Sequence, residues 1–144
     1  MMMNGGSMEQ MMAPSNRGAM RTGMALFRSH AEVRRSVTHL PNGIRAVSES
    51  DDPRIATLLQ THVAQMYARL DSKNAFPYPM SRSVPQLFAK SARYRRKLTL
   101  LPKGIEVLET SGDPEMVALI HAHAREIDGF VKDGMPSMMR SMMS

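Results

Sequence analysis

Histidine and methionine supply most of the candidate ligand chemistry in this chain. Its 144 residues include five histidines, sixteen methionines and no cysteine. Apolar residues recur every three or four positions around His62, with Met66 one turn later, and the same spacing surrounds His123. This spacing predicts that both imidazoles lie on the inward faces of two helices. Two imidazoles and a thioether form a plausible copper site, while two imidazoles alone suit zinc or axial haem ligation.

The alternative for each inward histidine is a core residue that is hydrogen-bonded to a backbone carbonyl. His30, in a leading helix, is a further candidate ligand on an inward face. His121 lies roughly 200° around the helix from His123, so the two cannot share a metal, and His121 is predicted to be exposed. It would cooperate with Met135 and the methionines that follow only if the C-terminal tail folds back. His39, on a strand, is predicted to be structural or solvent-facing.

Thirteen of the sixteen methionines lie in two clusters at the chain ends, Met1–Met24 and Met135–Met143. Their neighbours are Gly, Ser, Asn and Arg, which offer little to pack against. Thioethers on a polar segment indicate capture of Cu(I). The alternative is a pair of low-complexity tails with no ligand. The predicted organisation is a disordered Met-rich tail over 1–24, a single domain over 25–135 and a Met-rich C-terminal tail over 136–144.

Composition narrows the function classes further. The net charge is +6, but the basic residues are spread along the chain, and the run Arg93–Lys97 fits a solvated strand edge better than a nucleic-acid site. The lack of cysteine excludes disulfides and thiolate catalysis. No apolar run is long enough for a membrane span. No enzyme motif is present, and acidic residues such as Glu109 are assigned to hairpin ends and helix caps. The sequence therefore favours a non-enzymatic role over an enzymatic one.

An internal repeat organises the middle of the chain. A shift of 61 residues aligns Arg34–His62 with Arg95–His123, and 12 of the 29 aligned positions are identical. Two copies are too few for a solenoid, so the repeat predicts one domain with pseudo-twofold symmetry. The repeat units span about residues 34–70 and 95–132, and they place His62 and His123 at equivalent positions.

Each copy predicts a strand, a second strand and a helix. Three-residue links that end in Gly43 and Gly104 fit hairpins in which the glycine adopts a positive φ. An aspartate followed by proline then starts each helix. The fold class is α+β, with one four-stranded antiparallel sheet covered by helices on one face. The predicted strands are Val37–Leu40, Ile44–Glu49, Leu98–Leu101 and Ile105–Thr110; the predicted helices are Met24–Arg35, Pro53–Leu70, Ser83–Tyr94 and Pro114–Lys132.

Two long phrases carry a family resemblance. LPNGIRAVSESDDPRIATLLQTHVAQMYARL and LPKGIEVLETSGDPEMVALIHAHAREIDGFVKDGMPSM resemble the two halves of a family of small, often exported bacterial proteins. The resemblance covers about residues 25–139 and departs from the family pattern at Ser83–Phe88, where the family has an aspartate. It implies a location in the cell envelope and defines no activity. The matching positions are His30, His62, Met66, His123, Gly134 and Met135.

The sequence therefore predicts a non-enzymatic, soft-metal-binding protein of the bacterial periplasm, with copper as the metal. His62, His123 and Met66, with His30, would form the core site, and the terminal methionines would pass Cu(I) to a protein partner. A homodimer is possible, and no nucleic-acid partner is expected. The alternatives are a haem- or small-ligand-binding accessory or sensor protein, with the inward histidines as axial or polar contacts, and a purely structural interaction module.

Overall fold

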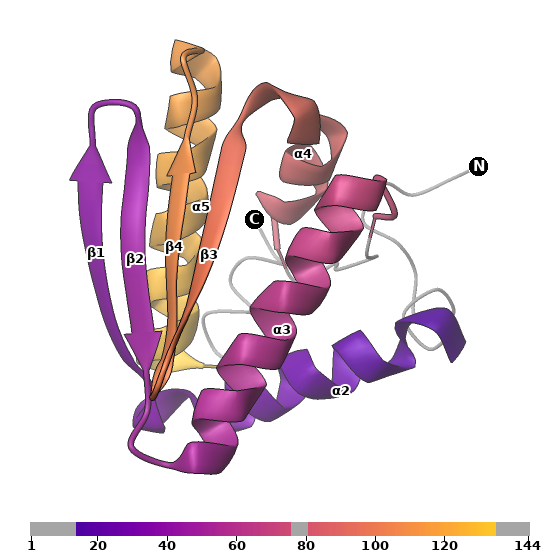
Figure 1. Cartoon of the computed structure of the whole chain (residues 1–144), viewed down its shortest axis with the longest axis vertical. Helices are drawn as coiled ribbons and strands as arrows, with labels where there is room; N and C mark the ends of the chain where they lie inside the picture. Colours follow the sequence, from indigo (N-terminus) through magenta and orange to yellow (C-terminus); the bar gives the residue numbers. More distant parts are fainter. Residues whose placement is uncertain (1–13, 76–80, 135–144) are drawn as a thin grey trace.

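The computed structural model describes residues 14–75 and 81–134, which form an α+β domain (Figure 1). Four antiparallel strands form one sheet in the order β1-β2-β4-β3. Helices cover one face of this sheet, as predicted. The strands are β1 Arg34–Leu40, β2 Gly43–Glu49, β3 Arg95–Leu101 and β4 Gly104–Thr110; the helices are α2 Pro14–Arg28, α3 Pro53–Ser72, α4 Val84–Ala89 and α5 Pro114–Asp133, with short 3₁₀ helices η1 His30–Glu32 and η2 Ser91–Arg93.

The pairing of β2 with β4 confirms the repeat. Ala46 pairs with Val107, its own counterpart under the shift of 61 residues, so the pseudo-twofold axis passes through this pair. Both side chains are buried beneath the helices. Across the axis, α3 contacts mainly β4 of the other repeat, and α5 contacts mainly β2. Because each helix covers strands of the other hairpin, neither repeat completes its core alone.

The duplication extends further towards the N-terminus than the sequence comparison indicated. Under the same shift, η1 coincides with η2, and the end of α2 coincides with α4. Phe27 and Phe88 are equivalent and are both buried in one apolar cluster. Each repeat is therefore a helix, a 3₁₀ turn, two strands and a helix. The predicted helices Met24–Arg35 and Ser83–Tyr94 end too late, because a 3₁₀ turn replaces the C-terminal part of each, and the first two residues of β1 replace the end of the former.

The hairpin turns differ from the prediction. Each strand pair is joined by two residues rather than three, and the glycine is the first residue of the next strand, paired with Leu40 or Leu101. A Cβ on Gly43 would lie 1.8 Å from the carbonyl oxygen of Glu109, and a Cβ on Gly104 would lie 2.0 Å from that of Ser48. Both positions require glycine because the neighbouring strand passes so close to the backbone. The predicted positive φ is found at Gly43, with φ +158°, and not at Gly104.

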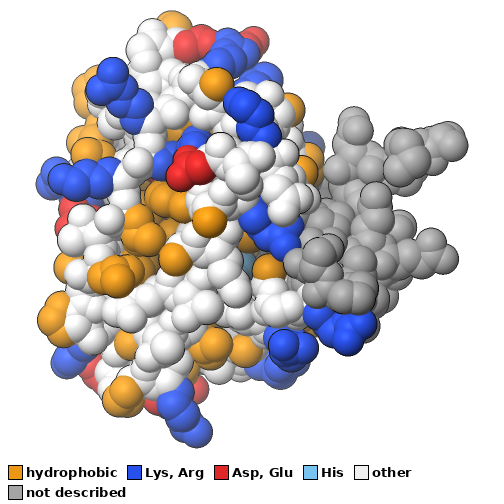
Figure 2. Space-filling model, turned by 45° about the vertical axis from the view of Figure 1, so that its right-hand side comes forward, with side chains coloured by type: hydrophobic (Ala, Val, Ile, Leu, Met, Phe, Trp, Pro, Cys, Tyr) orange, Lys and Arg blue, Asp and Glu red, His pale blue; other side chains and the backbone are white. Residues whose placement is uncertain are grey.

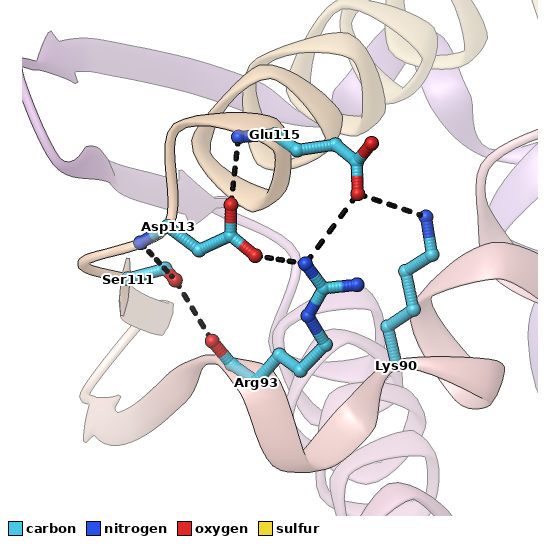
Figure 3. Close-up of polar contacts among 5 residues, drawn as sticks. All are labelled: Lys90, Arg93, Ser111, Asp113 and Glu115. Atoms are coloured by element: carbon cyan, nitrogen blue, oxygen red, sulfur yellow. Dashed lines mark hydrogen bonds and ion pairs between the residues drawn. The ribbon is translucent and has the colours of Figure 1, made fainter.

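The predicted helix starts are confirmed. The Asp52 carboxylate accepts a hydrogen bond from the Arg54 backbone N–H at α3, and Asp113 does the same for Glu115 at α5. Figure 3 shows how the second cap is tied to η2: Arg93 forms ion pairs with Asp113 and Glu115, and the Ser111 hydroxyl donates to the Arg93 carbonyl oxygen at 2.8 Å. The cap therefore fixes the start of α5 against the segment that leads into β3.

The predicted tail boundary at residue 24 is wrong. Helix α2 begins at Pro14, and its Ala19 and Phe27 are buried against α3, α4 and α5. Met20 and Met24 pack against the same cluster. These two methionines fill gaps in a core, the usual role of the residue. The six methionines before them, and the five from Met135 onward, lie outside the described residues.

Period-two alternation decides which strand residues face the helices. On β3, Arg95 and Lys97 face away from the helices and are exposed, as predicted for a strand edge. Arg96 instead faces the helices, donates to Asp71 at 2.6 Å and lies over the Tyr94 ring.

In the described part of the chain, none of the helices combines the length and apolarity needed to cross a membrane.

Candidate ligand-binding cavity

A cavity of about 200 Å³ lies between the inner face of the sheet and the helices, and both repeats line it. Most of the lining side chains are apolar. Three small residues leave the space open: Gly23 of α2, Ser48 of β2 and Ala124 of α5. Figure 2 shows apolar side chains gathered in a hollow on one face of the molecule, with Lys and Arg side chains around it. His30, His62, His123 and Met66 all contribute to this one cavity, as the predicted core site requires.

His62, on α3, has no hydrogen-bond partner for its Nδ1 atom, which is shut off from solvent. Burial lowers the pKa of His62 to about 4, because the imidazolium would lose its hydration. The ring is therefore neutral at pH 7 and keeps a nitrogen lone pair. A buried polar atom without a partner is uncommon in a folded protein and costs about 1–3 kcal/mol. The structural alternative, a histidine bonded to a backbone carbonyl, does not describe His62.

His123, on α5, is held by a short chain of hydrogen bonds. Its Nδ1 lies 2.7 Å from the Ser83 hydroxyl, which lies 2.6 Å from the Glu126 carboxylate. Burial lowers the pKa of His123, although the carboxylates of Glu109 and Glu126 oppose this shift. Burial alone raises the pKa of Glu126, but hydrogen bonds from Ser81, Ser83 and the Arg82 backbone outweigh it, so the pKa is lowered. Glu126 is therefore ionised at neutral pH, and His123 is neutral.

His30 lies in η1 and reaches the end of α5. Its Nδ1 is 2.8 Å from the Val131 carbonyl oxygen. Gly134 ends α5 with φ +68°, and a Cβ there would lie 2.5 Å from the His30 ring. The absence of a side chain at Gly134 therefore makes room for the imidazole, which packs directly against the helix terminus.

Glu109 is a functional candidate that the sequence reasoning assigned wrongly. Glu109 does lie at a hairpin end, next to the last residue of β4, but it is 6% exposed and lines the cavity instead of capping a helix. Tyr67 of α3 donates a hydrogen bond to its carboxylate at 2.5 Å. Tyr94, whose buried hydroxyl has no hydrogen-bond partner, also lines the cavity. The signal was available: Ile105, Val107 and Glu109 alternate on one strand face, so the face that buries the first two also buries the third.

His121 has a structural role that the repeat explains. Its Nε2 lies 2.8 Å from the Gly43 carbonyl oxygen and 3.1 Å from that of Leu40. At the equivalent position, Gln60 donates from its amide to the carbonyls of Gly104 and Leu101. Both side chains thus tie a helix to the turn of the other repeat. The prediction that His121 is exposed is wrong, because its ring is partly buried and contacts the His39 ring edge to face. His39 is exposed, as predicted.

The potential metal ligands on the cavity wall are the equivalent imidazoles of His62 and His123, the imidazole of His30 and the thioether of Met66. Among residues 14–75 and 81–134, no group of three or more His, Cys, Asp or Glu side chains has an arrangement that could hold a metal ion. A metal in the cavity would therefore depend on His62, His123 and Met66. His121 is outside this set, and Met135 lies outside the described residues. The assignment of copper stays a prediction.

Comparison with protein-family models, with curated proteins and with solved structures finds no match for this chain. The family suggested by the two repeated phrases therefore stays a prediction, as do the envelope location, the protein partner and the homodimer.

Proposed function

We propose that this domain binds a small, mainly apolar molecule in the cavity between its helices and its sheet, without catalysing a reaction. The observation that carries the proposal is a cavity of about 200 Å³ whose lining residues include His62, a histidine with a buried ring nitrogen that has no partner. Protein interiors are close-packed, and residual cavities cost on the order of 24 cal/mol per Å³. That figure applies to a closed cavity; the present cavity is partly open to solvent, so its cost is smaller, and a bound apolar molecule would reduce it.

The volume sets the size of the ligand. A cavity of about 150 Å³ lined by aliphatic and aromatic side chains is large enough to bind benzene. The present cavity, at about 200 Å³, accommodates one aromatic ring with a few further atoms. Haem is far larger, so it would enter only if α3 and α5 moved apart. This comparison favours a small aromatic or alicyclic molecule over the haem alternative.

Soft-metal binding is a second candidate, favoured by the shared position of His62, His123 and Met66 on the cavity wall. Two neutral imidazoles and a thioether in an apolar site suit Cu(I) better than a hard cation. The two candidates are separable, because removal of the Met66 sulfur by Met66→Leu would weaken metal binding while leaving an apolar ligand its space.

Titration calorimetry with benzene, toluene and indole tests the main proposal. The full chain should bind at least one of them with one-to-one stoichiometry. Ala124→Leu, which places three more carbon atoms in the cavity, should weaken binding at least tenfold. Ala122→Leu adds the same atoms at an exposed position of the same helix and should bind like the wild type. Equal binding by both variants, or none by the wild type, would exclude this cavity as the site. A parallel titration with Cu(I) and Zn(II) tests the second candidate.

A further inference from the structure

The contacts of His123 fix which of its ring nitrogens carries the proton. The Glu126 carboxylate is ionised and only accepts hydrogen bonds, so the Ser83 hydroxyl gives its single hydrogen to Glu126. The Ser83 oxygen must then accept from His123 Nδ1, at 2.7 Å. The proton of the neutral ring is therefore on Nδ1. His123 Nε2 keeps a lone pair, and this side chain lines the cavity.

His30 also uses Nδ1 as a donor. The Val131 carbonyl oxygen only accepts hydrogen bonds, so His30 Nδ1 carries the hydrogen in that contact. His62 is neutral, so its ring has one N–H donor and one lone pair, and Glu109 adds a buried carboxylate. Donors line the cavity as well, but the Arg35 guanidinium is already paired with Asp128 and Ser48, and the Tyr67 hydroxyl with Glu109, which leaves the Tyr94 hydroxyl without a partner. A ligand N–H or O–H would find an acceptor in His123 Nε2, whereas an anionic ligand would meet that lone pair and the Glu109 carboxylate.

We infer that the ligand is an uncharged aromatic molecule that carries a hydrogen-bond donor, as phenol and indole do, and that it donates to His123 Nε2. Glu126 and Ser83 act as positioning residues, because they set the tautomer of His123 without touching the ligand. This inference rests on the proposed function, since it assigns the chemical class of the molecule in the same cavity.

Indole and benzofuran provide a matched pair of probes, because they have nearly the same shape and differ in the replacement of the indole N–H by an oxygen. The wild type should bind indole about tenfold more tightly than benzofuran, since benzofuran leaves a buried acceptor unpaired. Benzoate, which is of similar size but anionic, should show no binding. Equal affinity for indole and benzofuran would overturn the inferred donor while leaving the cavity as a binding site. No binding of indole, benzofuran or benzene would remove the proposed function and the inference together.

Glu126→Gln should reverse the preference. The Arg82 backbone N–H, 2.8 Å from the present carboxylate, orients the amide oxygen towards itself. The amide NH₂ then faces Ser83 and donates to it, so the serine hydroxyl turns and donates to His123 Nδ1. The proton of His123 moves to Nε2, and benzofuran becomes the better ligand. Glu115→Gln, at an exposed position on the same helix, is the matched control and should keep the wild-type preference.

Long-range ¹H–¹⁵N NMR of the imidazoles reads the tautomer directly, independently of any ligand. In the wild type, His123 Nε2 should be the unprotonated nitrogen, and in Glu126→Gln it should be the protonated one. If Glu126→Gln does not fold, Ser83→Ala provides a second test: without the serine contact the tautomer is no longer fixed, and the preference for indole should shrink at least threefold. A wild-type spectrum with the proton on Nε2 would overturn the inference.

Discussion

Acidification should destabilise this fold through His62. The unfolded chain protonates this histidine with a pKa near 6.5, whereas burial lowers the pKa in the folded state to about 4. The unfolded state therefore binds the extra proton first, so stability is complete above pH 6.5 and is lost as the pH falls towards 4. At 1.36 kcal/mol per pH unit, the His62 contribution to the free energy of unfolding falls by about 2 kcal/mol between pH 7 and pH 5. The full loss, reached below pH 4, is about 3 kcal/mol.

Urea denaturation at pH 7 and pH 5 measures this effect as a difference between proteins. His62→Gln keeps a polar side chain that does not titrate, so its loss of stability over this interval should be about 2 kcal/mol smaller than that of the wild type. His39→Gln removes an exposed histidine and should leave the wild-type pH dependence unchanged. An equal loss in His62→Gln and the wild type would show that the buried imidazole is not held neutral, and the reasoning would be refuted.

Three substitutions and one control test how closely the domain is packed. Ile120→Ala removes a side chain that is 0% exposed and should lower the free energy of unfolding by about 2–5 kcal/mol in urea titrations. Gly104→Ala would drive a Cβ into a carbonyl oxygen of β2 and should be at least as costly, whereas Gly112→Ala, which meets nothing within 4 Å, should change stability by less than about 0.5 kcal/mol. Gly134→Ala should destabilise the protein by about 1 kcal/mol or more and shift the His30 ring resonances, because the Cβ would overlap that ring at a positive φ; unchanged resonances would contradict the assigned contact.

Local signals in the sequence were sufficient for the two hairpins and for helices α3 and α5. The repeat, the hairpin glycines and the Asp-Pro helix starts lie within a few residues of the structure they specify. They predicted the antiparallel sheet, the helices α3 and α5 and the equivalent inward positions of His62 and His123. The internal repeat also predicted the pseudo-twofold symmetry of the sheet, because two equivalent hairpins pair most simply about a twofold axis.

The parts that were missed depend on residues far apart in the chain. Ser83 and Glu126 are 43 residues apart, and Tyr67 and Glu109 are 42 residues apart, so no local sequence pattern predicts either contact. The start of α2 at Pro14 was hidden because its methionines pack against helices that come later in the sequence. The cavity lies where small residues from different helices and strands come together. The spacing of residues along a single helix or strand does not predict such a meeting point.

A crystal structure of the full chain soaked with indole tests the central claim most directly. The proposed function predicts electron density for one indole ring in the cavity between α3, α5 and the sheet, with its N–H within hydrogen-bond distance of His123 Nε2. Density for indole only elsewhere on the molecule, or side chains that fill the cavity and leave no space for a ring, would contradict it.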